Sequence, residues 1–248
     1  MSTQVTAEQA QTRFATETDS PGLPAGTMRW RQARLKDVVD ITLGSLMLVI
    51  VAPLMLLVAL AIKLDSPGPV LFVQQRVGVR RRRAGRWLVH EPTRFHVYKF
   101  RSMVAGADQG LHEAHIERYV AGAPLDGVVH ARFKLADDPR ITLVGRIIRR
   151  TSIDELPQLF NVLRRQMSLV GPRPVPVYEG RHYLDSCPER FWTLPGITGL
   201  WQVSGRCNLS ASEMSRLDAE YVHNASFWVD AKIMLRTVPA VFSRRGAG

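Results

Sequence analysis

Cysteine is scarce in this sequence: two of the 248 residues are cysteines, Cys187 and Cys207. They form no Cys-x-x-Cys pair and have no histidine cluster beside them, which favours unpaired thiols in a reducing cytosol over disulfides or zinc ligands. The seven histidines are scattered, and this argues against a metal hydrolase with clustered ligands. The start of the chain also lacks the charged-then-apolar pattern of a signal peptide.

Acidic residues are outnumbered: 33 lysines and arginines against 22 aspartates and glutamates give a net charge of +11. A chain with this balance seeks a polyanion, which is nucleic acid, anionic lipid or a phosphorylated small molecule, and charge alone does not choose among them. Hydrophobic residues make up 46% of the chain, so it is not disordered overall. Its length suits one main domain with an appendage.

One long apolar run interrupts the mixed composition. Residues 41–62 carry no charge over 22 positions; as a helix they would reach about 33 Å, enough to cross a bilayer. Basic residues flank the run on both sides, at 29–36 and 76–83, which places both ends in the cytoplasm by the positive-inside rule. Pro53 lies near the middle and would bend the helix. These features favour a re-entrant helix that enters and leaves on one side, with an ordinary kinked span as the alternative.

The pattern divides the chain into a loose tail over 1–33, the membrane helix over 34–66 and a folded domain over 67–245. The Asp65–Pro69 segment would end the helix sharply. The arginine cluster at Arg80–Arg86 is interpreted first as an anchor for lipid headgroups. Within the domain we expect strands at 70–73 and 95–100, a helix and loop at 106–124, and two amphipathic helices within 212–242.

The aromatic residues of these last two helices have two possible positions. Either they enter the core, or they lie in the membrane interface, and the sequence does not decide. The residues concerned are Tyr221, Phe227, Trp228 and Phe242.

An acidic pair stands at a predicted helix start. Ser152-x-x-Glu155 fits a capping box with Ser152 as N-cap, followed by apolar residues at helical spacing. Asp154 and Glu155 then lie in the first turn, where acids ordinarily complement the helix dipole. Arg149 and Arg150 precede the pair, with three residues between. Cations and dipole together favour an ionised carboxylate, which can serve as a nucleophile or a Mg²⁺ ligand.

Two motifs rich in proline and glycine follow. Pro172 and Pro174 bracket Arg173; they stiffen the backbone and would present the guanidinium rigidly to a phosphate, with a stiff surface turn as the alternative. The Pro195–Arg206 segment has glycines at 196, 199 and 205 that permit close approach of a ligand. Its Trp201 would either stack on a base or fill the core.

On these residues the chain resembles the bacterial sugar transferases, the small-domain monotopic phosphoglycosyl transferases that begin surface-polysaccharide assembly. The resemblance runs from about residue 36 to about residue 242. It implies an α/β (α+β) catalytic domain with a re-entrant membrane helix broken at a proline, matching Pro53, and interfacial amphipathic helices. Its place would be the cytoplasmic face of the bacterial inner membrane. The matching blocks are Lys99–Met103, Asp137–Thr142, Thr151–Gln158, Asn161–Pro174 and Pro195–Arg206.

The resemblance also implies a reaction. A hexose 1-phosphate, such as that of glucose or galactose, would pass from a UDP-sugar to polyprenyl (undecaprenyl) phosphate, with release of UMP. Asp154 would be the nucleophile that carries the phosphosugar, and Glu155 would bind Mg²⁺ or orient the acceptor phosphate, with Asp154 as a second candidate Mg²⁺ ligand. The expected phosphate ligands are Lys99, Arg101, Arg149, Arg150, Arg173 and Arg206.

The expected partners are a UDP-sugar, polyprenyl phosphate and anionic lipid; no nucleic acid is expected, and a homodimer is left open. One departure from the family pattern is Arg165, where glycine is usual. If that position needs a positive φ, an arginine costs about 1 kcal/mol there. The competing hypothesis is a membrane-anchored basic binding or scaffold protein without catalysis, which leaves the Asp154–Glu155 pair unexplained.

Overall fold

The computed structural model describes residues 28–106, 138, 140–205 and 209–242. These form a mixed α/β fold with one long apolar helix. The expected helix and loop at 106–124 lie almost entirely outside the described residues. The elements, with η for 3₁₀ helices, are β1 Met28–Arg29, α2 Trp30–Asp65, β2 Leu71–Ala84, β3 Trp87–Phe100, α4 Leu143–Arg150, η1 Ile153–Gln158, α5 Leu159–Leu163, β4 Ser168–Val170, β5 Val175–Pro176, α6 Val177–Ser186, η2 Pro188–Phe191, β6 Gly196–Thr198, α7 Leu200–Ser204, α8 Ala211–Asn224 and α9 Phe227–Phe242.

The larger sheet has the strand order β1-β3-β2-β5, and β4 and β6 form a second, parallel pair. The centre of the larger sheet is the long hairpin of β2 and β3. The two strands pair along their whole length, from Leu71 with Phe100 to Ala84 with Trp87. Both strands are much longer than the sequence predicted. The first four arginines of the expected headgroup anchor lie on β2, where Arg80 and Arg82 form ion pairs with Glu91 on the neighbouring strand.

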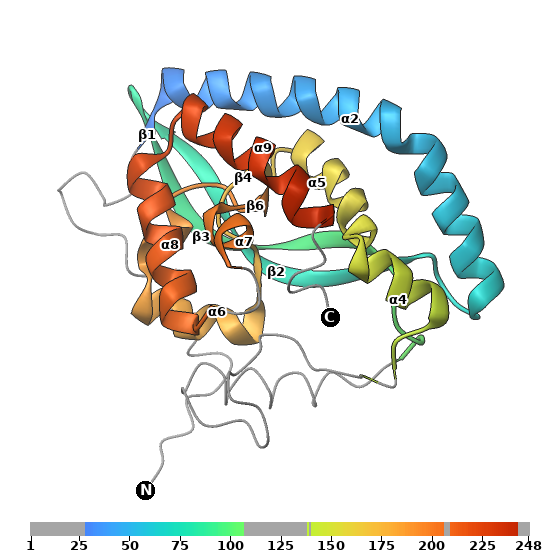
Figure 1. The fold of residues 1–248 in the computed structure, drawn as a ribbon. Coiled ribbons are helices and arrows are strands. Elements are labelled where there is room, and N and C mark those ends of the chain that lie inside the picture. The colour runs from blue at the N-terminus through green and yellow to red at the C-terminus, as the bar shows by residue number, and fades with distance from the viewer. Residues whose placement is uncertain (1–27, 107–137, 139, 206–208, 243–248) are drawn as a thin grey trace, which may run out of the picture.

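Helix α2 confirms the predicted apolar helix and extends it to 36 residues with Pro53 inside. It ends at Asp65, as the Asp65–Pro69 segment predicted. Figure 1 shows α2 running along one side of the molecule and curving in its C-terminal half. Among the described residues it is the one helix long and apolar enough to cross a membrane; its most apolar window has a mean hydropathy of 2.8 and is only 11% buried. A core helix of a soluble domain would be mostly buried, so α2 indicates membrane association.

Both ends of α2 are attached to the same folded domain. Near the N-terminal end, Lys36 forms an ion pair with Asp230 on α9, and Asp40 accepts a hydrogen bond from the backbone N–H of Leu169 on β4 (3.2 Å). At the C-terminal end, Asp65 accepts a hydrogen bond from the backbone N–H of Val144 on α4 (3.1 Å). The helix also packs on the domain between these two ends, where Leu43, Leu48 and Val51 contact the main core.

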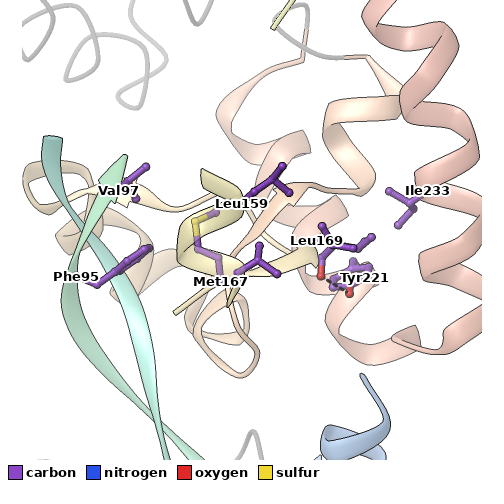
Figure 2. Close-up of a cluster of buried hydrophobic side chains, with 9 residues drawn as sticks. Phe95, Val97, Leu159, Met167, Leu169, Tyr221 and Ile233 are labelled. Carbon is purple, nitrogen blue, oxygen red and sulfur yellow. Dashed lines mark hydrogen bonds between the residues drawn. The ribbon is translucent and has the colours of Figure 1, made fainter. Parts of the chain in front are cut away.

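The main core lies between the hairpin and the C-terminal helices. Figure 2 shows Phe95 and Val97 at one side of this cluster and Tyr221 and Ile233 at the other, with Leu159, Met167 and Leu169 between them.

Tyr221 on α8 is fully buried, whereas Phe227 and Trp228, at the start of α9, are exposed, Trp228 to 79%. The two predicted C-terminal helices are confirmed as α8 and α9; Tyr221 enters the core and Phe227 and Trp228 lie at the surface, while the side chain of Phe242 lies outside the described part.

Asn161 joins the acidic segment to the central hairpin. Its side chain is fully buried and lies on α5, directly after η1. The amide group donates to the carbonyl of His96 (2.7 Å) and accepts from the backbone N–H of Tyr98 (3.2 Å). A buried amide satisfied from both sides in this way makes displacement costly. Asn161 therefore holds η1 next to Lys99, which follows Tyr98 in β3.

Candidate active site

The acidic pair occupies the first turn of η1, a 3₁₀ helix. Ser152 holds the N-cap position of η1, as predicted, but its φ is 56° and its side chain makes no capping hydrogen bond. The capping box predicted from the sequence is wrong. Ser152 also directly follows the C-cap of α4, Thr151: its backbone N–H donates to the carbonyl of Arg149 (3.3 Å), and its left-handed conformation is typical of the residue after a helix C-terminus. Its own carbonyl then accepts from the N–H of Glu155 (3.1 Å), which begins the 3₁₀ turn.

Glu155 lies between two cations. Its Oε1 accepts hydrogen bonds from Lys99 Nζ on β3 (3.1 Å) and from Arg173 Nη2 in the β4–β5 loop (2.6 Å). The second oxygen, Oε2, receives Arg173 Nη1 at 3.3 Å. Less than a fifth of each of these side chains is exposed. We call these three residues the ion cluster.

Burial and charge oppose one another in the ion cluster. Burial alone would raise the pKa of Glu155, but Arg173 and Lys99 outweigh it and hold that pKa well below its usual value. Burial lowers the pKa of Lys99 to about 8, although Glu155 raises it. The charge of Asp154 also raises the pKa of Lys99, which places Asp154, itself half-buried, within electrostatic reach of the cluster.

The β4–β5 loop is held from behind, as the sequence led us to expect for the segment between the two prolines. Pro172 and Pro174 are both buried. The buried guanidinium of Arg190 on η2 donates to the carbonyl of Arg173 (3.0 Å), and Arg76 on β2 donates to the carbonyl of Pro174 (3.0 Å). The Arg173 side chain thus leaves a backbone that is fixed on both sides.

Four charged residues behind the loop were not anticipated from the sequence. Arg190 forms an ion pair with Asp218 on α8 (3.1 Å), and both are almost fully buried; its guanidinium also lies over the ring of Tyr183. Glu179 on α6 is buried, and its charge raises the pKa of Arg76, which burial lowers to about 10. Nothing in the spacing of these residues distinguishes them from surface charges, so no sequence signal could have found them.

The remaining predicted residues lie apart from the ion cluster or outside the described part. Arg101 is buried and donates to the carbonyls of Ser66 and Pro67, so in this structure it caps the end of α2. Arg149 and Arg150 lie in the last turn of α4, the first half-buried and the second exposed.

Trp201 is buried against α8 and fills the core. Arg165 does adopt the positive φ that its position was suspected to need, 57°. Arg206 lies outside the described residues.

The carboxylates offer little to a metal ion on their own. Among the described residues no group of three or more histidine, cysteine or acidic side chains could hold one. Glu155, as placed, directs its oxygens at two cations. If Mg²⁺ binds here, Asp154 would be the carboxylate to hold it together with the substrate phosphates, the usual ligand set of this ion.

A membrane-associated domain whose acidic pair lies among buried cations is suited to phosphorylated substrates. Comparison with known proteins agrees. The family model described as bacterial sugar transferase matches residues 31–244, and the chain belongs to this family.

Similar proteins include the undecaprenyl-phosphate galactose phosphotransferase of Salmonella typhimurium, 42% identical over 86% of this chain and 41% of that protein. The UDP-glucose:undecaprenyl-phosphate glucose-1-phosphate transferase of Caulobacter vibrioides is 41% identical over 86% of this chain and 71% of its own length. The exopolysaccharide production protein ExoY of Rhizobium meliloti is 35% identical over 90% of this chain and 92% of its own length. This chain spans about two fifths of the length of several of the relatives it matches.

The buried Arg190–Asp218 pair gives a test of how the loop is held. We expect Arg190→Met to lower the free energy of unfolding by about 3–5 kcal/mol, because it leaves Asp218 buried without its cation. Burial already raises the pKa of Asp218 to about 6 although Arg190 lowers it. Without Arg190 that pKa rises further, so the loss of stability grows as the pH rises. Chemical unfolding at two pH values in detergent measures both effects.

The matched control is Arg216→Met, on the exposed Arg216–Glu220 pair of α8, which should change stability by at most about 0.5 kcal/mol. Equal, small effects of the two substitutions would show that Arg190 does not hold the loop.

Proposed function

We propose that this protein transfers a hexose 1-phosphate, of galactose or glucose, from a UDP-sugar to undecaprenyl phosphate at the cytoplasmic face of the bacterial inner membrane. The products are undecaprenyl-diphosphate-sugar and UMP, and the reaction begins a surface polysaccharide. The names of the relatives support the substrates. The observation that carries the proposal is the pair of cations, Lys99 and Arg173, fixed on Glu155 beside Asp154.

The transfer proceeds in two displacements. A carboxylate oxygen of Asp154 attacks the sugar-linked phosphorus; an Asp–O–P bond forms, the anhydride P–O bond breaks, and UMP leaves with the bonding electrons. An oxygen of undecaprenyl phosphate then attacks the same phosphorus, which forms the new anhydride and returns Asp154 as a free carboxylate. Dividing the transfer in this way lets one carboxylate serve two substrates. One anhydride is broken and one is formed, so no ATP is needed.

The cations supply the electrostatics of both steps. Phosphoryl transfer is catalysed mainly by positioning and by neutralising charge on the phosphoryl oxygens. Arg173 presents a planar donor fork from a fixed loop, which suits two phosphoryl oxygens at once. Arg149 and Arg150, five and four positions before Asp154, would extend the positive field. Mg²⁺, held by Asp154 and the diphosphate, would neutralise further charge.

The same proposal includes a re-entrant course for α2. Three observations support it: both ends of the helix are attached to one domain, Pro53 lies inside the helix, and basic residues flank it on both sides. Within the uncharged run at 41–62, 12 residues precede Pro53 and nine follow it, and neither apolar part is long enough to cross the hydrocarbon core. A helix that dips into one leaflet places Asp154 at headgroup depth, where a soluble diphosphate and a lipid phosphate can meet.

The nucleophile is tested by Asp154→Asn. The purified variant, incubated with UDP-galactose or UDP-glucose, Mg²⁺ and undecaprenyl phosphate, should release UMP at least about 10³-fold more slowly than the wild type, because an amide cannot form the phosphoryl intermediate. Wild type quenched without acceptor should carry the mass of one hexose phosphate, and the variant none. A variant with full turnover, or a wild type that binds lipid but never releases UMP, would contradict the proposal; the second result would favour the scaffold hypothesis.

The topology is tested by cysteine labelling. In a background with Cys187 and Cys207 replaced by alanine, Ser20→Cys in the tail and Gln75→Cys on β2 should both react with a membrane-impermeant maleimide only from the cytoplasmic side. Inverted and right-side-out vesicles provide the two conditions. Labelling of the two positions from opposite sides would instead establish a plain transmembrane span.

A further inference from the structure

Helix α4 lies between the point where α2 ends and the strand that carries Lys99. The backbone N–H of Val144 donates to Asp65, the last residue of α2 (3.1 Å). On its other side, Gly145 packs so tightly against the backbone that a Cβ there would lie 2.0 Å from the carbonyl oxygen of Ser102, shortly after β3. An amphiphile with its tail in the bilayer and its phosphate at Asp154 would therefore pass along α4.

The outer face of α4 is both apolar and basic. Leu143 is 68% exposed and Ile147 is 58% exposed, and Arg146 and Arg150 are exposed as well. Spacings of three, four and seven residues put all four on one side of a helix. The opposite side carries Gly145 and Ile148, which are buried in the domain.

This face continues the apolar surface of its neighbours. Ile148 of α4 shares a buried cluster with Val58 and Ile62 of α2. On that same half of α2, Leu60 and Leu64 are exposed. The apolar surface of the membrane helix thus leads onto Leu143 and Ile147.

The arginines lead from this surface to the nucleophile. Arg150 precedes Asp154 by four residues, and the turn between them is tight, with Thr151 and Ser152 both bonded back to carbonyls of α4. A phosphate monoester with a long hydrocarbon tail complements such a surface: arginine forks bind its oxygens, and aliphatic side chains pack along the tail.

We propose that the outer face of α4 receives the acceptor lipid. The first isoprene units of the polyprenyl phosphate lie on Leu143 and Ile147, and Arg146 and Arg150 guide its phosphate toward Asp154. This inference rests on the proposed function and adds to it a site for the second substrate.

Kinetics in nanodiscs of fixed, uncharged lipid composition test the assignment. Arg146→Gln should raise the KM for undecaprenyl phosphate about tenfold, the loss expected for one charge-assisted hydrogen bond, and leave the KM for the UDP-sugar within about twofold. Arg146→Lys should recover part of the loss, and Leu143→Ala with Ile147→Ala should raise the same KM. Single-turnover UMP release without acceptor should keep its wild-type rate in each variant.

The matched controls are Arg236→Gln and Leu235→Ala on α9, where Leu235 is 75% exposed and Arg236 is also exposed. These should leave both KM values unchanged. Equal effects at α4 and α9 would mean that α4 serves only general membrane attachment, and an unchanged acceptor KM in the α4 variants would also overturn the inference. Both results leave the proposed function standing. A wild type that releases no UMP would instead overturn the proposed function and this inference with it.

Discussion

One carboxylate, Glu155, holds together three segments that are distant in the sequence. Lys99 comes from the central hairpin, Arg173 from the β4–β5 loop and Glu155 from the 3₁₀ helix between them. Each of these charges would be unfavourable alone at this depth, because burial penalises the charged form. Together the three charges compensate one another, and the ion cluster fixes the positions of Lys99 and Arg173 relative to Asp154. The electrostatic part of the proposed chemistry depends on this arrangement.

The rest of the fold keeps the ion cluster in place and brings it to the membrane. Asn161 joins the segment after η1 to β3, and Arg76 and Arg190 hold the loop that carries Arg173. Helix α2 is bonded at both ends to the same domain, so its position in the bilayer determines the depth of the site. In the proposed function, the acceptor lipid lies on the outer face of α4, between α2 and the ion cluster.

The sequence was most informative where a pattern had one physical meaning. The uncharged run at 41–62 and the Asp65–Pro69 segment predicted α2 and its end, and Arg165 was suspected of a positive φ that it does adopt. One pattern misled because it fits two local structures equally well. Ser152-x-x-Glu155 looks like a capping box, yet Ser152 stands at the N-cap position in a left-handed conformation and its side chain makes no capping hydrogen bond.

Other features could not be predicted, because they depend on long-range contacts. The full length of β2 could not be predicted because a run of arginines is not typical of a strand. Arg80 and Arg82 are accommodated there by ion pairs with Glu91 on the neighbouring strand. Arg101 was grouped with the phosphate ligands by its motif, but the structure turns it toward the end of α2. The buried Arg190 and Asp218 look like ordinary surface charges until η2 and α8 are placed side by side.

The most direct measurement of the central interaction is the pH dependence of the KM for the UDP-sugar in the wild type and in Glu155→Gln. Burial lowers the pKa of Lys99 to about 8 while Glu155 raises it, so the wild type should lose affinity as the pH rises through about 8. Removing the charge of Glu155 lowers the pKa of Lys99 further, and the loss in the variant should begin at lower pH. If both proteins lost affinity over the same pH range, Glu155 would not be what keeps the cation in the site.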